Sequence, residues 1–168
     1  MAVAICPGSF DPPTNGHLDV IERASRHFER VVVCVAENPA KVPLFTAAER
    51  VDLLKSALGH LRNVEVESYQ GLLVDLARRR QAGVIVKGLR ALSDVERELQ
   101  MAQMNAGLFR EVDTMFITTD PRWSFVSSSG VKEVAGLGGD VSNLVPAGVN
   151  EALSKRFRKW VKPPSSGA

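Results

Sequence analysis

Short apolar runs rich in β-branched residues recur along the chain, with room for a helix between them. Most of these runs are almost continuously apolar, which is typical of strands covered on both faces in a parallel sheet. The third run alternates more between apolar and polar positions, and this pattern predicts a strand nearer the edge of the sheet. The five predicted strands span residues 2–6, 31–35, 64–68, 84–86 and 114–118.

Between the strands, apolar positions recur at the spacing of a helix. Two of these segments open with Ser or Thr followed three residues later by Glu, a capping-box pattern that satisfies free amides of the first helical turn. These pairs are Thr46 with Glu49 and Ser93 with Glu96. The predicted helices span residues 17–28, 46–58, 72–81, 93–108, 129–135 and 149–157.

The alternation of strands and helices predicts one α/β domain over residues 1–161. We expect a doubly wound parallel five-stranded sheet with helices on both faces, joined by right-handed crossovers. The polar, proline-containing segment 162–168 is expected to be a disordered tail. Four apolar side chains of the fourth helix are expected to pack in the core rather than to contact a ligand: Leu99, Met101, Met104 and Leu108.

Composition narrows the class of protein. The chain has 168 residues, 45% of them apolar, and a formal net charge of +2. So small a charge gives no reason to expect a nucleic-acid partner, although it suits a local basic site for small anions. We find no leader-like segment and no run of about 18 apolar residues, so we expect no membrane association and a cytoplasmic location. Cys6 and Cys34 lack metal-type spacing and are expected to be buried, reduced thiols.

Candidate chemistry follows the predicted strands at their carboxyl ends, the edge where open α/β sheets bind ligands. The first strand leads through Pro-Gly-Ser-Phe-Asp-Pro at 7–12 into Thr14-Asn15-Gly16-His17, a helix start whose free N–H groups attract phosphate. The helix dipole disfavours protonation of His17, which predicts a neutral imidazole N–H donor. The cations that follow strands and suit phosphate binding are Lys41, Lys87 and Arg90.

Taken singly, these features are weak. A histidine near a helix start is more often structural, three serines before a helix are usually only a cap, and Gly88 fits a plain turn. Other phosphate motifs are absent from the sequence, which has no GxxxxGK(S/T) and no GxGxxG after the first strand. The shared position of the features at one edge of the sheet is what favours a phosphate-binding site.

Together these blocks resemble the bacterial phosphopantetheine adenylyltransferases over residues 3–153, and Thr14-Asn15-Gly16-His17 is similar to the HxGH-type signature of the nucleotidyltransferase superfamily. The resemblance implies a Rossmann-like nucleotidyltransferase fold. It implies that ATP and 4′-phosphopantetheine give dephospho-coenzyme A and pyrophosphate, the penultimate step of coenzyme A synthesis. It also implies a Mg²⁺ requirement, a homohexamer and feedback inhibition by coenzyme A. The blocks that carry it are residues 7–12, 14–17, 38–41, 87–90, 94–98, 100–105 and 124–129.

The resemblance also implies roles for single residues. His17 and Lys41 are implied to be catalytic, by neutralising charge around the reacting α-phosphate of ATP. The implied ATP-binding residues are Ser9, Phe10, His17, Gly88, Leu89, Arg90, Glu98, Trp123, Ser124, Phe125, Val126, Ser127, Ser128 and Ser129. The implied phosphopantetheine-binding residues are Ser9, Lys41, Leu73 and Lys87.

The sequence departs from the family pattern at two positions. Lys87 stands where many members have Arg, which keeps the charge but loses bidentate geometry. Gly130 stands where a larger apolar residue is common, which puts the ordering of that helix start in question.

Several alternatives stay open on sequence alone. The chain resembles other small nucleotidyltransferases, so a cytidylyltransferase or a nicotinamide-nucleotide adenylyltransferase remains an alternative. A nucleotide-binding protein without activity is a third. An aminoacyl-tRNA synthetase shares the signature, but the chain is too short for one. For the adenylyl transfer itself, an already ionised substrate phosphate would attack the α-phosphorus in line, without a general base.

Overall fold

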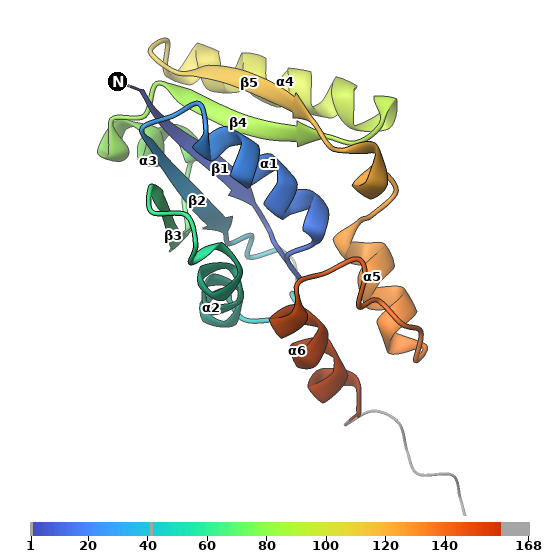
Figure 1. Cartoon of the computed structure of the whole chain (residues 1–168). Coiled ribbons are helices and arrows are strands. Elements are labelled where there is room, and N and C mark those ends of the chain that lie inside the picture. The colour runs from blue at the N-terminus through green and yellow to red at the C-terminus, as the bar shows by residue number, and fades with distance from the viewer. Residues whose placement is uncertain (1, 41, 159–168) are drawn as a thin grey trace, which may run out of the picture.

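The computed structural model describes residues 2–40 and 42–158. Its parallel sheet has the strand order β3-β2-β1-β4-β5 (Figure 1). The order reverses between β1 and β4, which is the switch point where such sheets bind ligands. The doubly wound fold and the edge position of the third strand are thereby confirmed. The strands are β1 (Val3–Gly8), β2 (Arg30–Ala36), β3 (Val64–Tyr69), β4 (Val84–Leu89) and β5 (Asp113–Thr118).

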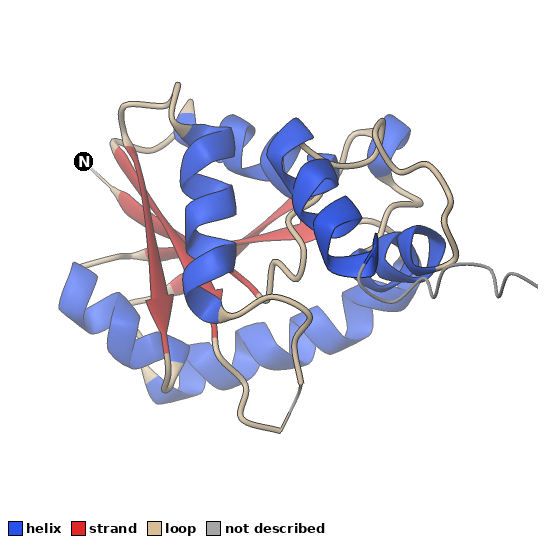
Figure 2. Ribbon diagram, turned by 90° about the horizontal axis from the view of Figure 1, so that it is seen from below, coloured by secondary structure: helices blue, strands red, loops and turns tan. Residues whose placement is uncertain are grey.

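Helices cover both faces of the sheet (Figure 2). The helices α1 and α2 pack on one face, and α3 packs on the other. Helix α4 contacts α3, β4 and β5. Figure 1 shows α5 and α6 beyond the carboxyl ends of the strands, where they share a separate apolar cluster with Phe45. The helices are α1 (Asn15–Ser25), α2 (Ala47–Leu58), α3 (Leu73–Arg80), α4 (Leu92–Leu108), the 3-10 turn η1 (Pro121–Trp123), α5 (Ser128–Gly136) and α6 (Ala147–Arg158).

The central strands are buried on both sides. In β2, Val31, Val33 and Val35 join the core under α1 and α2, while Val32 and Cys34 join the core under α3. Each fully buried Val stabilises the fold by roughly 1.5–3 kcal/mol, which explains why both faces of this strand are apolar. The two thiols, Cys6 and Cys34, are buried and free, as expected. Burial raises the pKa of each to about 12, so both are neutral.

Several predicted boundaries shift. Strand β4 continues to Leu89, so Lys87, Gly88 and Leu89, which were expected after this strand, lie within it, and Arg90 follows it. The capping box at Thr46 is confirmed. The Thr46 side chain accepts from the Glu49 amide at 3.2 Å, and the Glu49 carboxylate accepts from the Thr46 amide at 2.8 Å. The second predicted box is wrong. Helix α4 begins at Leu92, one residue earlier than expected, with Ala91 as an N-cap that offers no side-chain acceptor. The predicted tail, 162–168, lies outside the described residues.

The expected burial of the apolar side chains on α4 is also wrong. Leu99, Met101, Met104 and Leu108 keep 46%, 45%, 60% and 51% of their surface exposed. Because the main contacts of α4 are with α3, β4 and β5, one side of this long helix suffices for packing within the described part of the chain. Within the described residues, no helix has the length and apolar character needed to cross a bilayer.

Candidate active site

A large cavity lies at the carboxyl ends of the strands, with a volume of about 900 Å³. Its wall is formed by segments far apart in sequence, from β1 and α1 through β4 and α4 to α5. The expectation that the chemistry-bearing segments meet at one edge is therefore confirmed for the segments that follow β1 and β2, for the end of β4 and for the start of α5. The predicted site residues that line the cavity are Ser9, Phe10, His17, Leu73, Lys87, Gly88, Arg90, Glu98, Val126, Ser127, Ser128 and Ser129.

The other predicted site residues lie elsewhere. Leu89, Trp123, Ser124 and Phe125 are not part of the cavity wall, and Phe125 is 73% exposed. Lys41, expected to be catalytic, lies outside the described residues. The segment 123–125 instead forms the end of the 3-10 turn η1 and the connection toward α5.

The first turn of α1 fixes the His17 ring. Thr14 is the N-cap, and its main-chain amide donates to Nδ1 of His17 at 3.0 Å. Because Nδ1 accepts this bond, the proton of the neutral ring sits on Nε2. Desolvation in the cavity lowers the pKa of His17 to about 4, with further lowering from the nearby charges of Arg90 and Lys87. The ring is thus a neutral N–H donor at neutral pH, as its place on the helix suggested.

Phe10 holds the turn before this helix in an unusual conformation. Its φ of 48° lies in the left-handed region, where non-glycine residues are uncommon and often functional. Its buried ring meets the His17 ring edge-on at 5.1 Å between centroids. A Cβ on Gly8 would lie 2.9 Å from the Phe10 ring, so Gly8 makes room for this ring as well as for a ligand.

Lys87 on β4 and Arg90 just after this strand each meet an acid from α4. Lys87 Nζ lies 3.2 Å from Glu98 Oε2. Arg90 donates through Nε and Nη2 to Asp94 at 3.2 and 3.3 Å, and through Nη1 to the Val126 carbonyl at 3.1 Å. The carboxylates hold the cations at the cavity wall and orient them before a ligand arrives.

The serine segment forms the start of α5. Ser127 is its N-cap, and its Oγ accepts from the Gly130 amide at 3.0 Å. Ser128 Oγ donates to the Pro12 carbonyl at 2.8 Å, which ties this helix to the turn after β1. The cap forms although residue 130 is glycine, so Gly130 does not prevent an ordered start of α5. The N-terminus of α5 presents the serines and free amides to the cavity.

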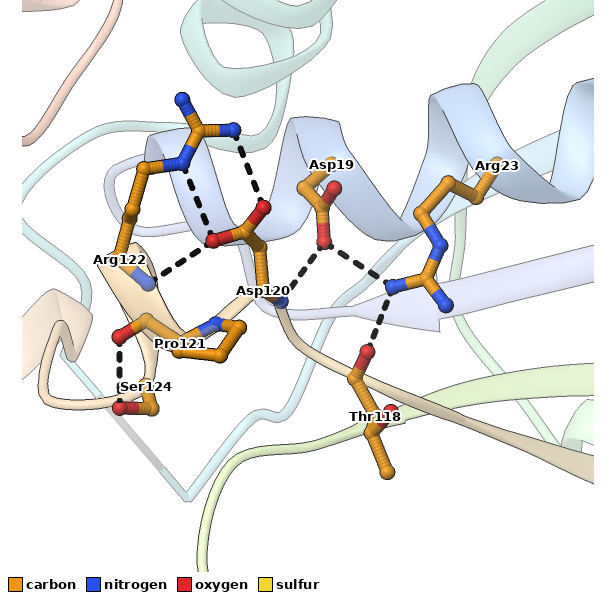
Figure 3. A network of polar contacts seen from close by, with 7 residues as sticks. All are labelled: Asp19, Arg23, Thr118, Asp120, Pro121, Arg122 and Ser124. Carbon is orange, nitrogen blue, oxygen red and sulfur yellow. Dashed lines mark hydrogen bonds and ion pairs between the residues drawn. The ribbon is translucent and has the colours of Figure 1, made fainter.

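Polar contacts also join α1 to the segment that follows β5 (Figure 3). Asp19 accepts from the Asp120 amide at 3.0 Å and from Arg23 Nη1 at 3.4 Å. The same Arg23 nitrogen donates to the Thr118 carbonyl at 2.6 Å. The carboxylate of Asp120 in turn accepts from Arg122. This network fixes the segment between β5 and η1 to α1, the helix that carries His17.

Two cavity residues carried no sequence signal of their own role. Asp11 is buried, and its carboxylate accepts from the Leu44 and Phe45 amides and from Lys132 Nζ, each at 2.9 Å. Arg50 is buried and bonds main-chain carbonyls. Charged side chains in turns and on helices are mostly solvated, so only the tertiary structure shows that these two are buried.

Comparison with known proteins agrees with this geometry. Residues 5–134 match a family model described as cytidylyltransferase-like. The phosphopantetheine adenylyltransferase of Gloeobacter violaceus is 56% identical over 92% of this chain and 96% of its own length. The enzyme of that name from Streptomyces coelicolor is 57% identical over 94% of this chain and 99% of its own length.

A solved structure shares the fold at much lower identity. It is a Vibrio parahaemolyticus protein provisionally assigned as a nicotinate-nucleotide adenylyltransferase. Its TM-score is 0.71 with 20% sequence identity, over 95% of this chain and 97% of the other.

Proposed function

The chain belongs to the phosphopantetheine adenylyltransferase family, and from that premise we propose that it transfers the adenylyl group of ATP to 4′-phosphopantetheine. The products are dephospho-coenzyme A and pyrophosphate, so the reaction is the penultimate step of coenzyme A synthesis. The observation that carries the proposal is identity above one half along nearly the whole chain. The neutral His17 donor and the paired cations in the cavity supply a chemistry that suits it.

In the proposed reaction, a phosphate oxygen of 4′-phosphopantetheine attacks the α-phosphorus of ATP in line. A new P–O bond forms, the bond from the α-phosphorus to the bridging oxygen breaks, and pyrophosphate leaves. The attacking phosphate is already ionised, so no protein base is needed. Catalysis then depends on positioning and on stabilising charge in the transition state. His17 would donate Nε2–H to the α-phosphate, and Lys41 would add charge there.

The two substrates divide the cavity in this proposal. Arg90, Gly88 and the start of α5 bind the ATP phosphates, with Ser9, Phe10, Leu89, Glu98 and 123–126 completing the nucleotide site. Leu73, Lys87, Lys41 and Ser9 bind the phosphopantetheine. Support comes from the cavity wall, where Leu73 and Lys87 lie with Arg90 and Ser127–Ser129 in one continuous space. When ATP binds, Arg90 can keep its Val126 contact and turn part of its guanidinium toward phosphate.

The proposal includes Mg²⁺ carried by the nucleotide. In residues 2–40 and 42–158, no three His, Cys, Asp or Glu side chains gather as a metal cage. Mg²⁺ at nucleotide sites is commonly held by substrate phosphates and water with few protein carboxylates, so binding through ATP does not require such a cage. When bound together with ATP, the ion would supply positive charge that offsets the charge of the nucleotide phosphates.

Three further proposals concern the protein as a whole. We propose that it assembles as a homohexamer, which the exposed apolar side chains of α4 support. We propose inhibition by coenzyme A, because coenzyme A contains the pantetheine and adenylate parts that the cavity would bind. We place the activity in the cytoplasm, where ATP is abundant and buried thiols stay reduced.

The decisive experiment is pyrophosphate release from ATP with different acceptors. We expect release with 4′-phosphopantetheine and Mg²⁺, and none with pantetheine, which lacks the attacking phosphate. Nicotinamide mononucleotide and nicotinate mononucleotide serve as competing acceptors. Turnover only with a mononucleotide would favour the alternative nucleotidyltransferases. Nucleotide binding without turnover of any acceptor would favour a non-catalytic protein. Titration of the active enzyme with coenzyme A tests the inhibition.

A further inference from the structure

Arg50 of α2 is an almost fully buried cation in the wall of the cavity, with 4% of its surface exposed. Its Nη1 donates to the Ser9 carbonyl at 2.6 Å, and its Nε donates to the Thr46 carbonyl at 3.3 Å. Both acceptors are neutral, and they use two of the three guanidinium nitrogens. Within residues 2–40 and 42–158, no carboxylate lies within 4.0 Å of this guanidinium.

A buried charge without a counter-charge is costly, and proteins normally pair it. Three other cations in this wall illustrate the rule. Lys87 meets Glu98, Arg90 meets Asp94, and Lys132 meets Asp11. Arg50 is buried more deeply than these three, and its hydrogen-bond partners among the described residues are the two carbonyls. Its positive charge is therefore not balanced by a carboxylate in this part of the chain.

We propose that Arg50 is a phosphate-binding residue of this cavity, an inference that rests on the proposed function. Its Nη2, which has no hydrogen-bond partner within residues 2–40 and 42–158, would donate to a phosphate oxygen. Guanidinium groups match phosphate geometry and form strong charge-assisted bonds. Its Nη1 bond to the Ser9 carbonyl places this phosphate beside the turn between β1 and α1. The phosphate can come from the acceptor or from ATP, and the test separates these sources.

Calorimetric titrations of Arg50→Gln against the unmodified protein test the proposal. ATP alone and 4′-phosphopantetheine alone are the ligands, and pantetheine is the acceptor without phosphate. Loss of one charged hydrogen bond is expected to weaken binding of the phosphate ligand by about tenfold to a hundredfold. A loss confined to 4′-phosphopantetheine, with pantetheine unchanged, assigns the acceptor phosphate to Arg50. A loss confined to ATP assigns a nucleotide phosphate.

Arg156→Gln is the matched control. Arg156 stacks on Phe45 and pairs with Glu49, next to Arg50 on α2, but it does not line the cavity. We expect its affinities for both ligands to be unchanged. Far-ultraviolet circular dichroism and thermal unfolding check that each variant is folded. If Arg50→Gln does not fold, Arg50→Lys replaces it, because it keeps the charge and loses the fork geometry, with an expected loss of about threefold to tenfold.

Equal affinities of the unmodified protein and the Arg50 variant for both phosphate ligands would overturn the inference. That result differs from a failure of the proposed function. If the unmodified protein binds neither ATP nor 4′-phosphopantetheine, the proposed function fails. Inorganic pyrophosphate then becomes the probe for Arg50, and equal affinity of the two proteins for pyrophosphate would refute its phosphate-binding role.

Discussion

At the scale of single residues, the His17 ring depends on a capping interaction for its chemical state. Thr14 donates its amide to Nδ1, so the ring cannot turn without breaking the cap of α1. Desolvation and the charges of Arg90 and Lys87 keep the ring neutral. The same contacts therefore set its orientation, its tautomer and its protonation. The sequence placed His17 in the first turn of a helix, but only the structure identifies Nε2 as the donor.

His17→Ala is expected to lower kcat by about 10²–10³-fold, because one donor to developing transition-state charge is lost. The KM for ATP should change much less, since Arg90 and the start of α5 remain. Steady-state kinetics of pyrophosphate release measure both constants. His27→Ala is the control, because His27 is exposed and lies outside the cavity wall. Equal loss in kcat and in ATP affinity would argue against a role specific to the transition state.

The tautomer of His17 can be tested without turnover. We expect ¹⁵N NMR at pH 7 to show an unprotonated Nδ1 and a protonated Nε2. Since its pKa is lowered to about 4, the ring should remain neutral on acidification until the pH approaches that value. Thr14→Ala keeps the main-chain donor and should preserve the tautomer. A His17 ring that is charged at pH 6 would contradict this assignment.

At the scale of elements, the apolar runs predicted all five strands because a strand buried on both faces leaves a nearly continuous pattern. The end of β4 was missed because Lys87, Gly88 and Leu89 look like a loop in sequence, although they pair with β5 in register. Contacts between elements were even harder to predict from the sequence. Neither the Lys87–Glu98 pair nor the bonds of Asp11 to the segment before α2 could be predicted, since they depend on tertiary approach.

Asp11→Ala is expected to lower the free energy of unfolding by about 3–5 kcal/mol, because it leaves Lys132 and two amides without their partner. Burial alone would raise the pKa of Asp11, but bonds from the Leu44 amide, Lys132 and the Phe45 amide outweigh it and lower the pKa. The ionised carboxylate therefore stabilises the fold at neutral pH. This contribution is lost as the pH falls through the lowered value.

Urea unfolding at pH 7, 5 and 3 measures this effect. The difference between Asp11→Ala and the unmodified protein should be full at pH 7 and 5 and smaller at pH 3. Asp140→Ala is the control, since its carboxylate is exposed and bonds only the nearby Ser142. A difference for Asp11→Ala that does not shrink on acidification would mean that packing, not charge, explains it.

At the scale of the whole molecule, α4 shows where prediction from one chain stops. Its helical apolar pattern is genuine, but a pattern cannot say whether a face is covered by the same chain or by another copy. The core already closes with α1 and α2 on one face of the sheet and α3 on the other. The exposed apolar side chains of α4 are therefore not needed for packing within a single chain. It is the feature that the proposed homohexamer would explain.

Met104→Glu combined with Leu108→Glu is expected to dissociate the assembly, because each charge would be buried without a partner at an interface between copies. Sedimentation velocity measures the change as a shift from hexamer toward smaller species. Both side chains are half-exposed in the single chain, so its unfolding temperature should change little at concentrations where it is already dissociated. Leu137→Glu is the control, since Leu137 is 84% exposed and lies on a different element, just beyond α5. A protein that stays hexameric with both glutamates in place would show that α4 is not the contact, and a monomeric unmodified protein would refute the hexamer itself.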